Sequence, residues 1–458
     1  MEKNFLKEQK KYVIKEGEVL TGSALLKKKN KKVIDRVNYM IDNMDHNKAF
    51  LHSKNTNNIK SDTLLENFKE RYKKYRMDWN NQPMNSIKNK FSSSKLKRKN
   101  VPPLCLDIET AAICDLACPF CFREFTVTPD KIIDENFCYN LINQASELKI
   151  PSIKFNWRGE PLLHPKLPNF IEHAKKKGIL ETIINTNATK LDSNLSKKLI
   201  DSGLDFIIYS FDGGSKKTYE KMRPGRFTDN NFDKVYENIK NFKKIKDKLN
   251  AKLPFTKIQM ILTKETFEEQ ESFFNLFSDY VDDVSISQYT ERGGKLSDLN
   301  EDSLTQYHSQ LEKNNLPVGT PYMRDAFNNI KIAKGRKPCE QPFQRLLVTY
   351  EGRVAMCCYD WGAKHPIGYS NDKCFDNHKD YDEVLENVKK NKKGFELLKN
   401  IKMPKSYNDP EKKIESLKEI WFGKEIDKVR NSHIFNKGED IKICKNCSFK
   451  DVYDWIEK

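Results

Sequence analysis

Residues 114–122, Cys-Asp-Leu-Ala-Cys-Pro-Phe-Cys-Phe, decide how the rest of the chain is interpreted. The thiols of Cys114, Cys118 and Cys121 are separated by three and then two residues, so on a loop they can converge on three corners of an iron-sulfur cube. Most such cubes have four cysteine ligands, and three leave one iron open to an external ligand. The stretch therefore predicts a cluster with a chemical task, although three thiols and a donor from elsewhere could also hold zinc.

The composition indicates a polar globular protein. The chain has 458 residues, of which 37% are hydrophobic and 32% charged, enough for two to three domains. No apolar run approaches the roughly 20 residues that a membrane span needs, and the start lacks the apolar core of a signal peptide. Eleven cysteines in close clusters indicate metal ligands in a reducing compartment. We therefore expect a cytoplasmic protein that has no membrane contact.

The net charge of +17, from 82 Lys and Arg against 65 Asp and Glu, raises the question of nucleic acid. The basic runs at 27–32 and 95–99 lie among Asn and Ser, and no aromatic residues are interleaved with them. A solvated surface explains such runs better than a binding face does. Nucleic acid is therefore the least favoured partner.

Residues 1–100 form a lysine-rich N-terminal region without a chemical motif. Two apolar stripes at helical spacing predict two amphipathic helices, which either cover the rest of the protein or bind a partner. The stripes are Val33, Ile34, Val37, Met40, Ile41 and Met44, and then Leu64, Leu65, Phe68 and Tyr72. The stretch 85–100, rich in Asn, Ser and Lys, is typical of a linker.

From residue 101 to about 325, short apolar runs alternate with helical patterns. Such repetition predicts a parallel sheet with right-handed crossovers. Six units make an α/β fold of the open, partial (β/α)6 barrel type, related to the eight-stranded barrel. The expected strands are 104–113, 152–156, 181–185, 206–210, 256–262 and 283–288, and the expected helices are 134–148, 166–177, 193–201, 230–248 and 267–277.

The cysteine loop, with Phe120 directly before the third cysteine, resembles the CxxxCxΦC signature of radical S-adenosylmethionine (SAM) enzymes. In that family a [4Fe-4S] cluster sits on the three cysteines, and the amine and carboxylate of SAM chelate its open iron. The loop follows the first expected strand, which is where working residues lie in parallel β/α folds. The resemblance therefore implies a SAM-binding cluster on Cys114, Cys118 and Cys121.

The stretch Arg158-Gly159-Glu160-Pro161 after the second expected strand resembles the GGEP motif with which the family holds the SAM amino group. A small residue lets backbone approach a ligand, and a carboxylate can accept a hydrogen bond from an ammonium. Arg158 stands where the first glycine is usual. The resemblance assigns Gly159, Glu160 and Pro161 to cofactor binding.

Short polar residues follow the third and fourth expected strands, in 185–188 (Asn-Thr-Asn-Ala) and 210–213 (Ser-Phe-Asp-Gly). Both resemble family loops, with Ala188 in place of the usual glycine, and they suggest that Asn187, Ser210 and Asp212 touch the nucleoside of SAM. Ordinary turn chemistry is the alternative. Arg223, in a stretch resembling the family's Tyr-x-x-x-Arg, would bind the SAM carboxylate or be a solvated helix-end charge.

The C-terminal region, 326–458, contains a second cysteine pattern. Cys339 is followed after twelve residues by Gly352 and after four more by Cys357, and Cys444-x-x-Cys447 comes later. This resembles the α+β SPASM/twitch extension of radical SAM enzymes and implies an auxiliary [4Fe-4S] cluster on these four cysteines, with zinc as the alternative. Residues 346–356 predict a β-hairpin that presents Cys357.

The resemblance implies an enzyme that reductively cleaves SAM to a 5′-deoxyadenosyl radical and abstracts hydrogen from a substrate, giving oxidation or epimerisation. A sugar, cyclitol or nucleotide-linked small molecule is the first substrate class, a ribosomally made peptide the second, and RNA the third. Flavodoxin or ferredoxin would supply electrons. Cys358, adjacent to Cys357, would donate a hydrogen atom in an epimerase or simply pack. The competing class is a non-enzymatic adaptor with zinc at both sites.

Overall fold

The computed structural model describes residues 34–121, 123, 128–263, 265–288, 338–360, 362–363, 365–376, 413–445 and 447. It also gives the backbone of two strand pairs, β1 (Tyr12–Lys15) with β2 (Glu18–Thr21) and β9 (Tyr322–Arg324) with β10 (Ile330–Ile332). The expected boundary between the second and third regions, at 325–326, lies outside the described residues.

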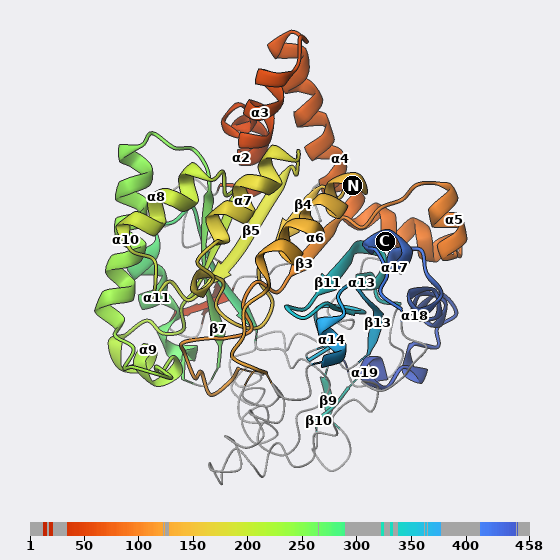
Figure 1. Cartoon of the computed structure of the whole chain (residues 1–458). Coiled ribbons are helices and arrows are strands. Elements are labelled where there is room, and N and C mark those ends of the chain that lie inside the picture. The colour runs from red at the N-terminus through yellow and green to blue at the C-terminus, as the bar shows by residue number, and fades with distance from the viewer. Residues whose placement is uncertain are drawn as a thin grey trace.

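The six expected strands are confirmed as neighbours in one parallel α/β sheet (Figure 1). They run in chain order, which is the order of a partial barrel. Their bounds are β3 (Cys105–Ile108), β4 (Ser152–Lys154), β5 (Glu181–Thr186), β6 (Phe206–Ser210), β7 (Phe255–Leu262) and β8 (Asp283–Gln288).

Helices connect the strands, and several begin at the side-chain caps that the sequence offers. Asp134, Asp192 and Asn231 each accept a hydrogen bond from a backbone N–H of the first helical turn. The helices are α6 (Glu135–Glu147), α7 (Leu167–Lys176), α8 (Ser193–Asp201), α9 (Lys216–Met222), α10 (Phe232–Lys248) and α11 (Gln270–Phe277). All the expected helices are present, and α9 is an addition.

The two faces of the sheet differ because side chains alternate along each strand. In β6, Ile207 and Tyr209 are buried in the main hydrophobic core, together with residues of the connecting helices. Ile208 and Ser210 are only half-buried and point to the opposite, inner face. The helices therefore cover the outer face, and the inner face is available for polar chemistry.

The C-terminal region continues the same sheet. The predicted hairpin is confirmed as β11 (Arg345–Val348) and β12 (Arg353–Ala355), and β13 (Pro366–Tyr369) pairs with β12. The sequence did not indicate that β11 would pair in parallel with β3, which joins the two regions through backbone hydrogen bonds. The helices here are α13 (Gln341–Gln344), α14 (Lys373–Asp376), α17 (Leu417–Trp421), α18 (Lys424–Ile434) and α19 (Lys442–Lys445).

Residues 34–100 of the N-terminal region are mainly helical, as predicted. Its helices are α2 (Arg36–Asp42), α3 (Lys48–Thr56), α4 (Ser61–Lys88) and α5 (Ser93–Arg98). The linker interpretation of 85–100 is wrong for most of that stretch, because α4 extends to Lys88 and α5 packs through buried Ser93 and Leu96. No helix among the described residues has the length and apolarity that crossing a bilayer requires.

These N-terminal helices close one end of the inner face of the sheet. The Arg36 guanidinium lies 4.5 Å from the centre of the Phe206 ring, and the rings of Tyr39 and Phe255 are 5.4 Å apart. Tyr72 donates a hydrogen bond to Glu181. Glu181, Phe206 and Phe255 are the first residues of β5, β6 and β7, so the helices contact the beginnings of the strands. In Figure 1 the arrow of β5 points away from α2, α3 and α4.

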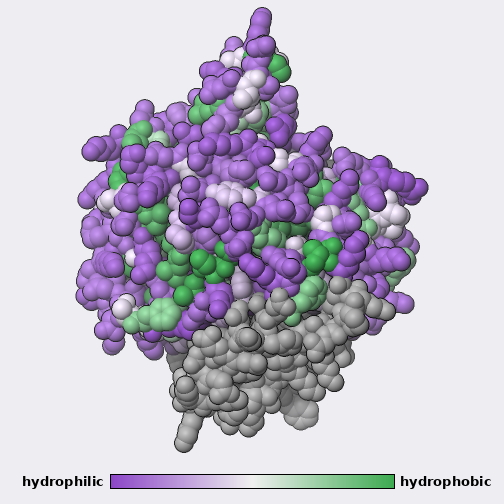
Figure 2. All heavy atoms as spheres, viewed as in Figure 1, coloured by the Kyte–Doolittle hydropathy of each residue, from purple (hydrophilic) through white to green (hydrophobic). Residues whose placement is uncertain are grey.

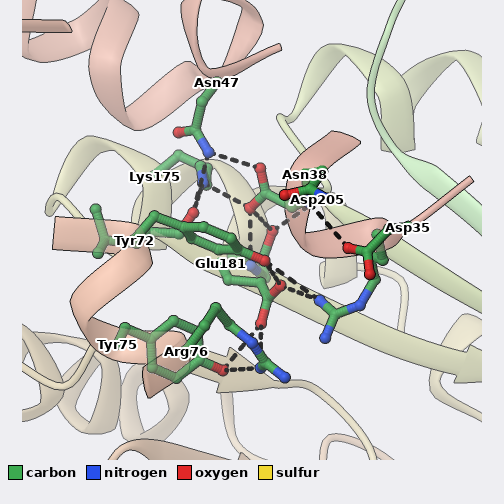
Figure 3. Close-up of polar contacts among 12 residues, drawn as sticks. Asp35, Asn38, Asn47, Tyr72, Tyr75, Arg76, Lys175, Glu181 and Asp205 are labelled. Carbon is green, nitrogen blue, oxygen red and sulfur yellow. Dashed lines mark hydrogen bonds and ion pairs between the residues drawn. The ribbon is translucent and has the colours of Figure 1, made fainter. Parts of the chain in front are cut away.

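Buried Glu181 is the centre of this closure, and Figure 3 shows Tyr72 and Tyr75 pointing toward it. Its carboxylate accepts hydrogen bonds from Tyr72 Oη at 2.8 Å and Tyr75 Oη at 3.0 Å, and forms an ion pair with Arg36. The cations Arg36 and Arg76 and the two hydroxyls hold the pKa of Glu181 below its usual value despite burial. Four polar partners thus compensate for burying one charge.

A second buried carboxylate, Asp205, fixes α3 to the barrel. Asn47 Nδ2 donates to Asp205 Oδ1 at 2.9 Å, and Lys175 Nζ lies 2.6 Å from Oδ2. The face of the N-terminal helices that Figure 2 shows is mostly hydrophilic. Of the two roles considered for the helices, covering the barrel is therefore confirmed.

Replacing Arg36 by Leu should lower the free energy of unfolding on the order of 3 kcal/mol, because it leaves Glu181 buried without its nearest cation. Chemical denaturation of the apoprotein measures this value. The matched control is Lys73→Ala, which breaks an exposed pair with Glu70 and should cause no measurable change. Equal stability of the two variants would show that the Glu181 network does not hold the helices.

Candidate functional site

The cysteine loop follows β3 at the carboxyl end of the sheet. Cys118 is buried, and Cys114 and Cys121 are half-buried. Burial raises the pKa of the Cys114 thiol well above its usual value, and the Glu160 carboxylate and the thiols of Cys121 and Cys118 act in the same direction. Since such electrostatic effects need proximity, the three predicted ligands share one neighbourhood.

Two other strand-end loops hold the backbone of the cysteine loop. On one side Glu160 N donates to Ile113 O at 2.8 Å. On the other side Ala117 N donates to Pro224 O at 2.9 Å, and Arg226 N donates to Asp115 O at 2.8 Å. All of these bonds join backbone atoms, so they fix the path of the loop that carries the three cysteines.

Gly159 sits where no side chain fits. A Cβ at this position would lie 2.2 Å from Ile113 O and 2.5 Å from Ala111 O, both backbone atoms. The absence of a side chain therefore allows the two loops to pack directly against each other. This contact explains why the motif requires glycine here, and Pro161 follows as the first residue of a short 3-10 turn, 161–163.

The carboxylate of Glu160 joins its own loop to the loop that follows β5. Its Oε1 accepts hydrogen bonds from Leu162 N at 3.0 Å and Thr186 Oγ1 at 2.6 Å, and its Oε2 accepts one from Asn187 N at 2.7 Å. Burial raises the pKa of Glu160 to about 7, against the opposing effect of these hydrogen bonds. Next to an ammonium the ionised form would be favoured, as binding the SAM amino group requires.

Asn187 connects its own loop to the cysteine loop. Its Nδ2 donates to Asp115 Oδ1 at 2.8 Å and lies 3.9 Å from Cys114 Sγ. The following residue, Ala188, has φ of +60°, a backbone conformation that favours glycine and explains the glycine in the resembling motif. The structure thus brings Asn187, Glu160 and Cys114 together.

Asp212 and Arg223 form a buried pair. Arg223 Nε donates to Asp212 Oδ2 at 2.8 Å, and Asp212 Oδ1 accepts from Ile261 N at 2.6 Å. The guanidinium carbon of Arg223 is 5.9 Å from the centre of the Phe120 ring, beside the cysteine loop. Arg223 is only 7% exposed, which excludes the solvated helix-end alternative. Half-buried Ser210 ends β6 on the inner face.

Arg158, which stands in place of a glycine, pairs with Glu109 at the end of β3. Its Nε and Nη2 donate to the two carboxylate oxygens of Glu109 at 2.6 and 2.8 Å. Glu109 also accepts from Tyr350 N at 3.3 Å, in the β11–β12 turn. The neighbouring Trp157 donates through Nε1 to Cys358 O at 3.0 Å. Residues 157 and 158 therefore connect the Gly-Glu-Pro loop to the hairpin of Cys357 and Cys358.

The four C-terminal cysteines predicted as ligands lie near enough to affect one another's pKa. Burial raises the pKa of Cys357 well above its usual value, and the thiols of Cys358, Cys444 and Cys447 act in the same direction. The pKa of Cys339 is likewise raised, by burial first and with contributions from Cys357 and Cys447. Among the residues that the structure describes, there is no group of three or more His, Cys, Asp or Glu side chains that could hold a single metal ion.

Two features of this region were not assigned from the sequence. His433 Nε2 lies 3.6 Å from Cys444 Sγ, although 430–433 had been noted only as a resembling stretch. Cys358 Sγ donates to Gln341 Oε1 at 3.5 Å. Cys105 and Cys138, predicted as structural thiols, are buried, and so is Cys374.

The parallel sheet carries the three-cysteine loop after β3, its first strand along the chain. Residues 108–277 match the Radical SAM superfamily. The chain therefore carries a radical SAM domain, and its expected cofactors are SAM and a [4Fe-4S] cluster.

Known proteins similar to this chain have diverse names. The tungsten-containing aldehyde ferredoxin oxidoreductase cofactor-modifying protein of Pyrococcus furiosus is 25% identical over 171 residues, which are 36% of this chain and 45% of that protein. The GTP 3′,8-cyclase of Chlorobaculum tepidum is 33% identical over 122 residues, 26% of this chain and 36% of that protein. The chain thus spans less than half the length of these relatives.

Two solved structures are similar to part of this chain. Streptococcus suis SuiB bound to its precursor peptide SuiA matches with a TM-score of 0.44 and 17% identity, covering 76% of this chain and 75% of SuiB. BtrN in complex with AdoMet and 2-DOIA matches with a TM-score of 0.39 and 16% identity, covering 75% of this chain and 92% of BtrN.

Replacing Gly159 by Ala should separate the cysteine loop from the Glu160 loop and abolish SAM binding, because the new methyl would overlap Ile113 O. Iron content after anaerobic reconstitution and calorimetric SAM affinity measure the effect. The control Gly178→Ala introduces strain at φ +84° but has nothing within 4 Å of the new Cβ. It should therefore retain its iron content and its SAM affinity. Unchanged SAM affinity in Gly159→Ala would contradict the role of the close contact.

Restoring the usual glycine at position 158 should destabilise this protein by about 3 to 5 kcal/mol, because Glu109 would remain buried without the guanidinium. Thermal or denaturant unfolding measures the loss. The double variant Arg158→Gly with Glu109→Gln should recover part of it. Equal stability of Arg158→Gly and the wild type would mean that the pair is dispensable.

Proposed function

We propose that the chain reductively cleaves SAM and abstracts hydrogen from a small-molecule substrate, with oxidation or epimerisation as the outcome. The observation that carries this proposal is the junction of the cysteine loop with Glu160 and Asn187. Asn187 Nδ2 lies 3.9 Å from Cys114 Sγ, and Asn187 N donates to Glu160 Oε2 at 2.7 Å. A carboxylate acceptor and the thiols thus lie side by side at the carboxyl end of the barrel.

The residues at this junction fit the expected cofactors. Cys114, Cys118 and Cys121 would hold the cluster, and Gly159, Glu160 and Pro161 would bind the SAM amine. When bound, the reduced cluster and SAM together supply methionine and a 5′-deoxyadenosyl radical. Phe120, Asn187, Ser210, Asp212 and Arg223 stay assigned to SAM binding. The ion pair of Asp212 with Arg223 supports a joint role in SAM binding, in which Asp212 orients the Arg223 guanidinium.

The C-terminal cysteines Cys339, Cys357, Cys444 and Cys447 would hold an auxiliary [4Fe-4S] cluster. Their mutual electrostatic influence supports this assignment. In an oxidation, this cluster would supply an acceptor for one substrate electron. In an epimerisation, Cys358 Sγ would supply a hydrogen atom. Its bond to Gln341 Oε1 requires the thiol form, which carries the transferable hydrogen.

A sugar, cyclitol or nucleotide-linked molecule is the substrate class that we favour. Relatives named GTP 3′,8-cyclase support a nucleotide-type molecule. The described N-terminal helices are engaged in closing the barrel, which is a further reason to place a ribosomally made peptide second. Flavodoxin or ferredoxin is the proposed electron donor, and the cytoplasm is the proposed location.

Anaerobic incubation of reconstituted protein with SAM and dithionite tests the proposal. Formation of 5′-deoxyadenosine, followed by mass spectrometry, supports it, and stimulation by sugars, nucleotides, peptides or RNA ranks the substrate classes. A colourless protein that contains zinc and no iron would support the non-enzymatic adaptor instead.

Cys118→Ala should abolish 5′-deoxyadenosine formation, because the cluster loses one of its three ligands. Cys444→Ala should leave some SAM cleavage that is uncoupled from substrate turnover. The matched control is Cys138→Ala, a buried thiol on α6 that should retain cleavage. Wild-type activity in the Cys118 variant would overturn the assignment of the loop.

A further inference from the structure

His433 lies among the C-terminal cysteines and contacts two of them. Cys339 N donates to His433 Nδ1 at 3.4 Å, and Cys444 Sγ lies 3.6 Å from His433 Nε2. The histidine is only 1% exposed. Its two ring nitrogens therefore bridge segments of the chain that are about a hundred residues apart, at 339 and 444.

The contact with Cys339 decides the tautomer of the neutral ring. A backbone N–H can only donate, so Nδ1 must be the acceptor. The ring proton then lies on Nε2, which faces the Cys444 sulfur. A sulfur that binds iron is a thiolate and accepts hydrogen bonds. The geometry thus matches an N–H···S hydrogen bond to a cluster ligand.

Arg430, one helical turn before His433, holds α18 in place. Its Nη1 donates to Ser93 Oγ at 2.7 Å and Trp421 O at 2.8 Å, and its Nε donates to Pro342 O at 3.0 Å. Burial lowers the pKa of Arg430 to about 9. Because residues three apart share one helix face, this anchor also fixes the position of the imidazole.

We propose that His433 is a positioning residue of the auxiliary cluster, which holds the Cys339 backbone and donates a hydrogen bond to the Cys444 sulfur. The inference rests on the proposed four-cysteine cluster. A hydrogen bond to a ligand sulfur withdraws electron density and raises the reduction potential of a cluster. His433 would therefore make the auxiliary cluster a better electron acceptor, which favours oxidation over epimerisation.

The experiment isolates the auxiliary cluster in a chain in which Cys114, Cys118 and Cys121 are all replaced by Ala. Iron and sulfide content of the reconstituted triple variant report whether the C-terminal cysteines hold a cluster. An EPR-monitored redox titration then gives the midpoint potential of that cluster alone. Neither measurement depends on a substrate or on SAM cleavage.

Three substitutions in this background separate the two contacts of the ring. His433→Leu removes both and should shift the midpoint potential downward. His433→Asn can replace the Nδ1 acceptor but does not reach Cys444, so it should show the same downward shift. His433→Gln can reach the sulfur with its amide N–H and should keep a potential near the starting value.

The outcomes distinguish the two proposals. The role of His433 is supported if the midpoint potential falls in His433→Asn and stays near the starting value in His433→Gln. This holds even if His433→Leu loses its cluster. Unchanged midpoint potentials in both His433→Asn and His433→Leu overturn the positioning role of His433. A triple variant without iron overturns the auxiliary cluster itself. The control His173→Leu removes a half-buried histidine on α7 that contacts Asn143, and its potential should not change.

Discussion

The close packing of three strand-end loops is the constraint on which the site depends. Residues 111–117 lie against Gly159 on one side and against 224–226 on the other, through backbone hydrogen bonds. These contacts fix the path of the backbone that carries Cys114, Cys118 and Cys121. Glu160 then extends the junction to Asn187. The cysteine spacing alone does not fix the backbone of the loop. The contacts with Gly159 and with residues 224–226 fix it.

The two ends of the barrel carry different kinds of structure. At the carboxyl ends of the strands, polar loops gather around the cysteines. At the beginnings of the strands, α2, α3 and α4 cover the inner face through the Glu181 network and aromatic contacts. Covering this end of the sheet limits the access of water to the inner face, as the proposed radical chemistry would require. The helices α2, α3 and α4 of the lysine-rich N-terminal region are thus packed against the barrel.

The radical SAM domain and the cysteine-rich C-terminal region are parts of one sheet. β11 pairs with β3, and Glu109 accepts hydrogen bonds from both Arg158 and Tyr350 N. A displacement of the hairpin that presents Cys357 would therefore reach the Gly-Glu-Pro loop. This connection gives a physical path by which the two cysteine sites could respond to each other. The arginine that departs from the family motif is a component of that path.

The sequence by itself determined the six parallel strands, the positions of the three motif loops and the grouping of the cysteines. These features follow from local information, namely period-two and helical apolar patterns and short spacings. Only the tertiary structure decided that Arg158 pairs with Glu109, that His433 bridges Cys339 and Cys444, and that the N-terminal helices close the barrel. Each of these contacts joins residues at least 11 positions apart. Such pairings depend on how strands and helices pack in space, and no local pattern in the chain encodes them.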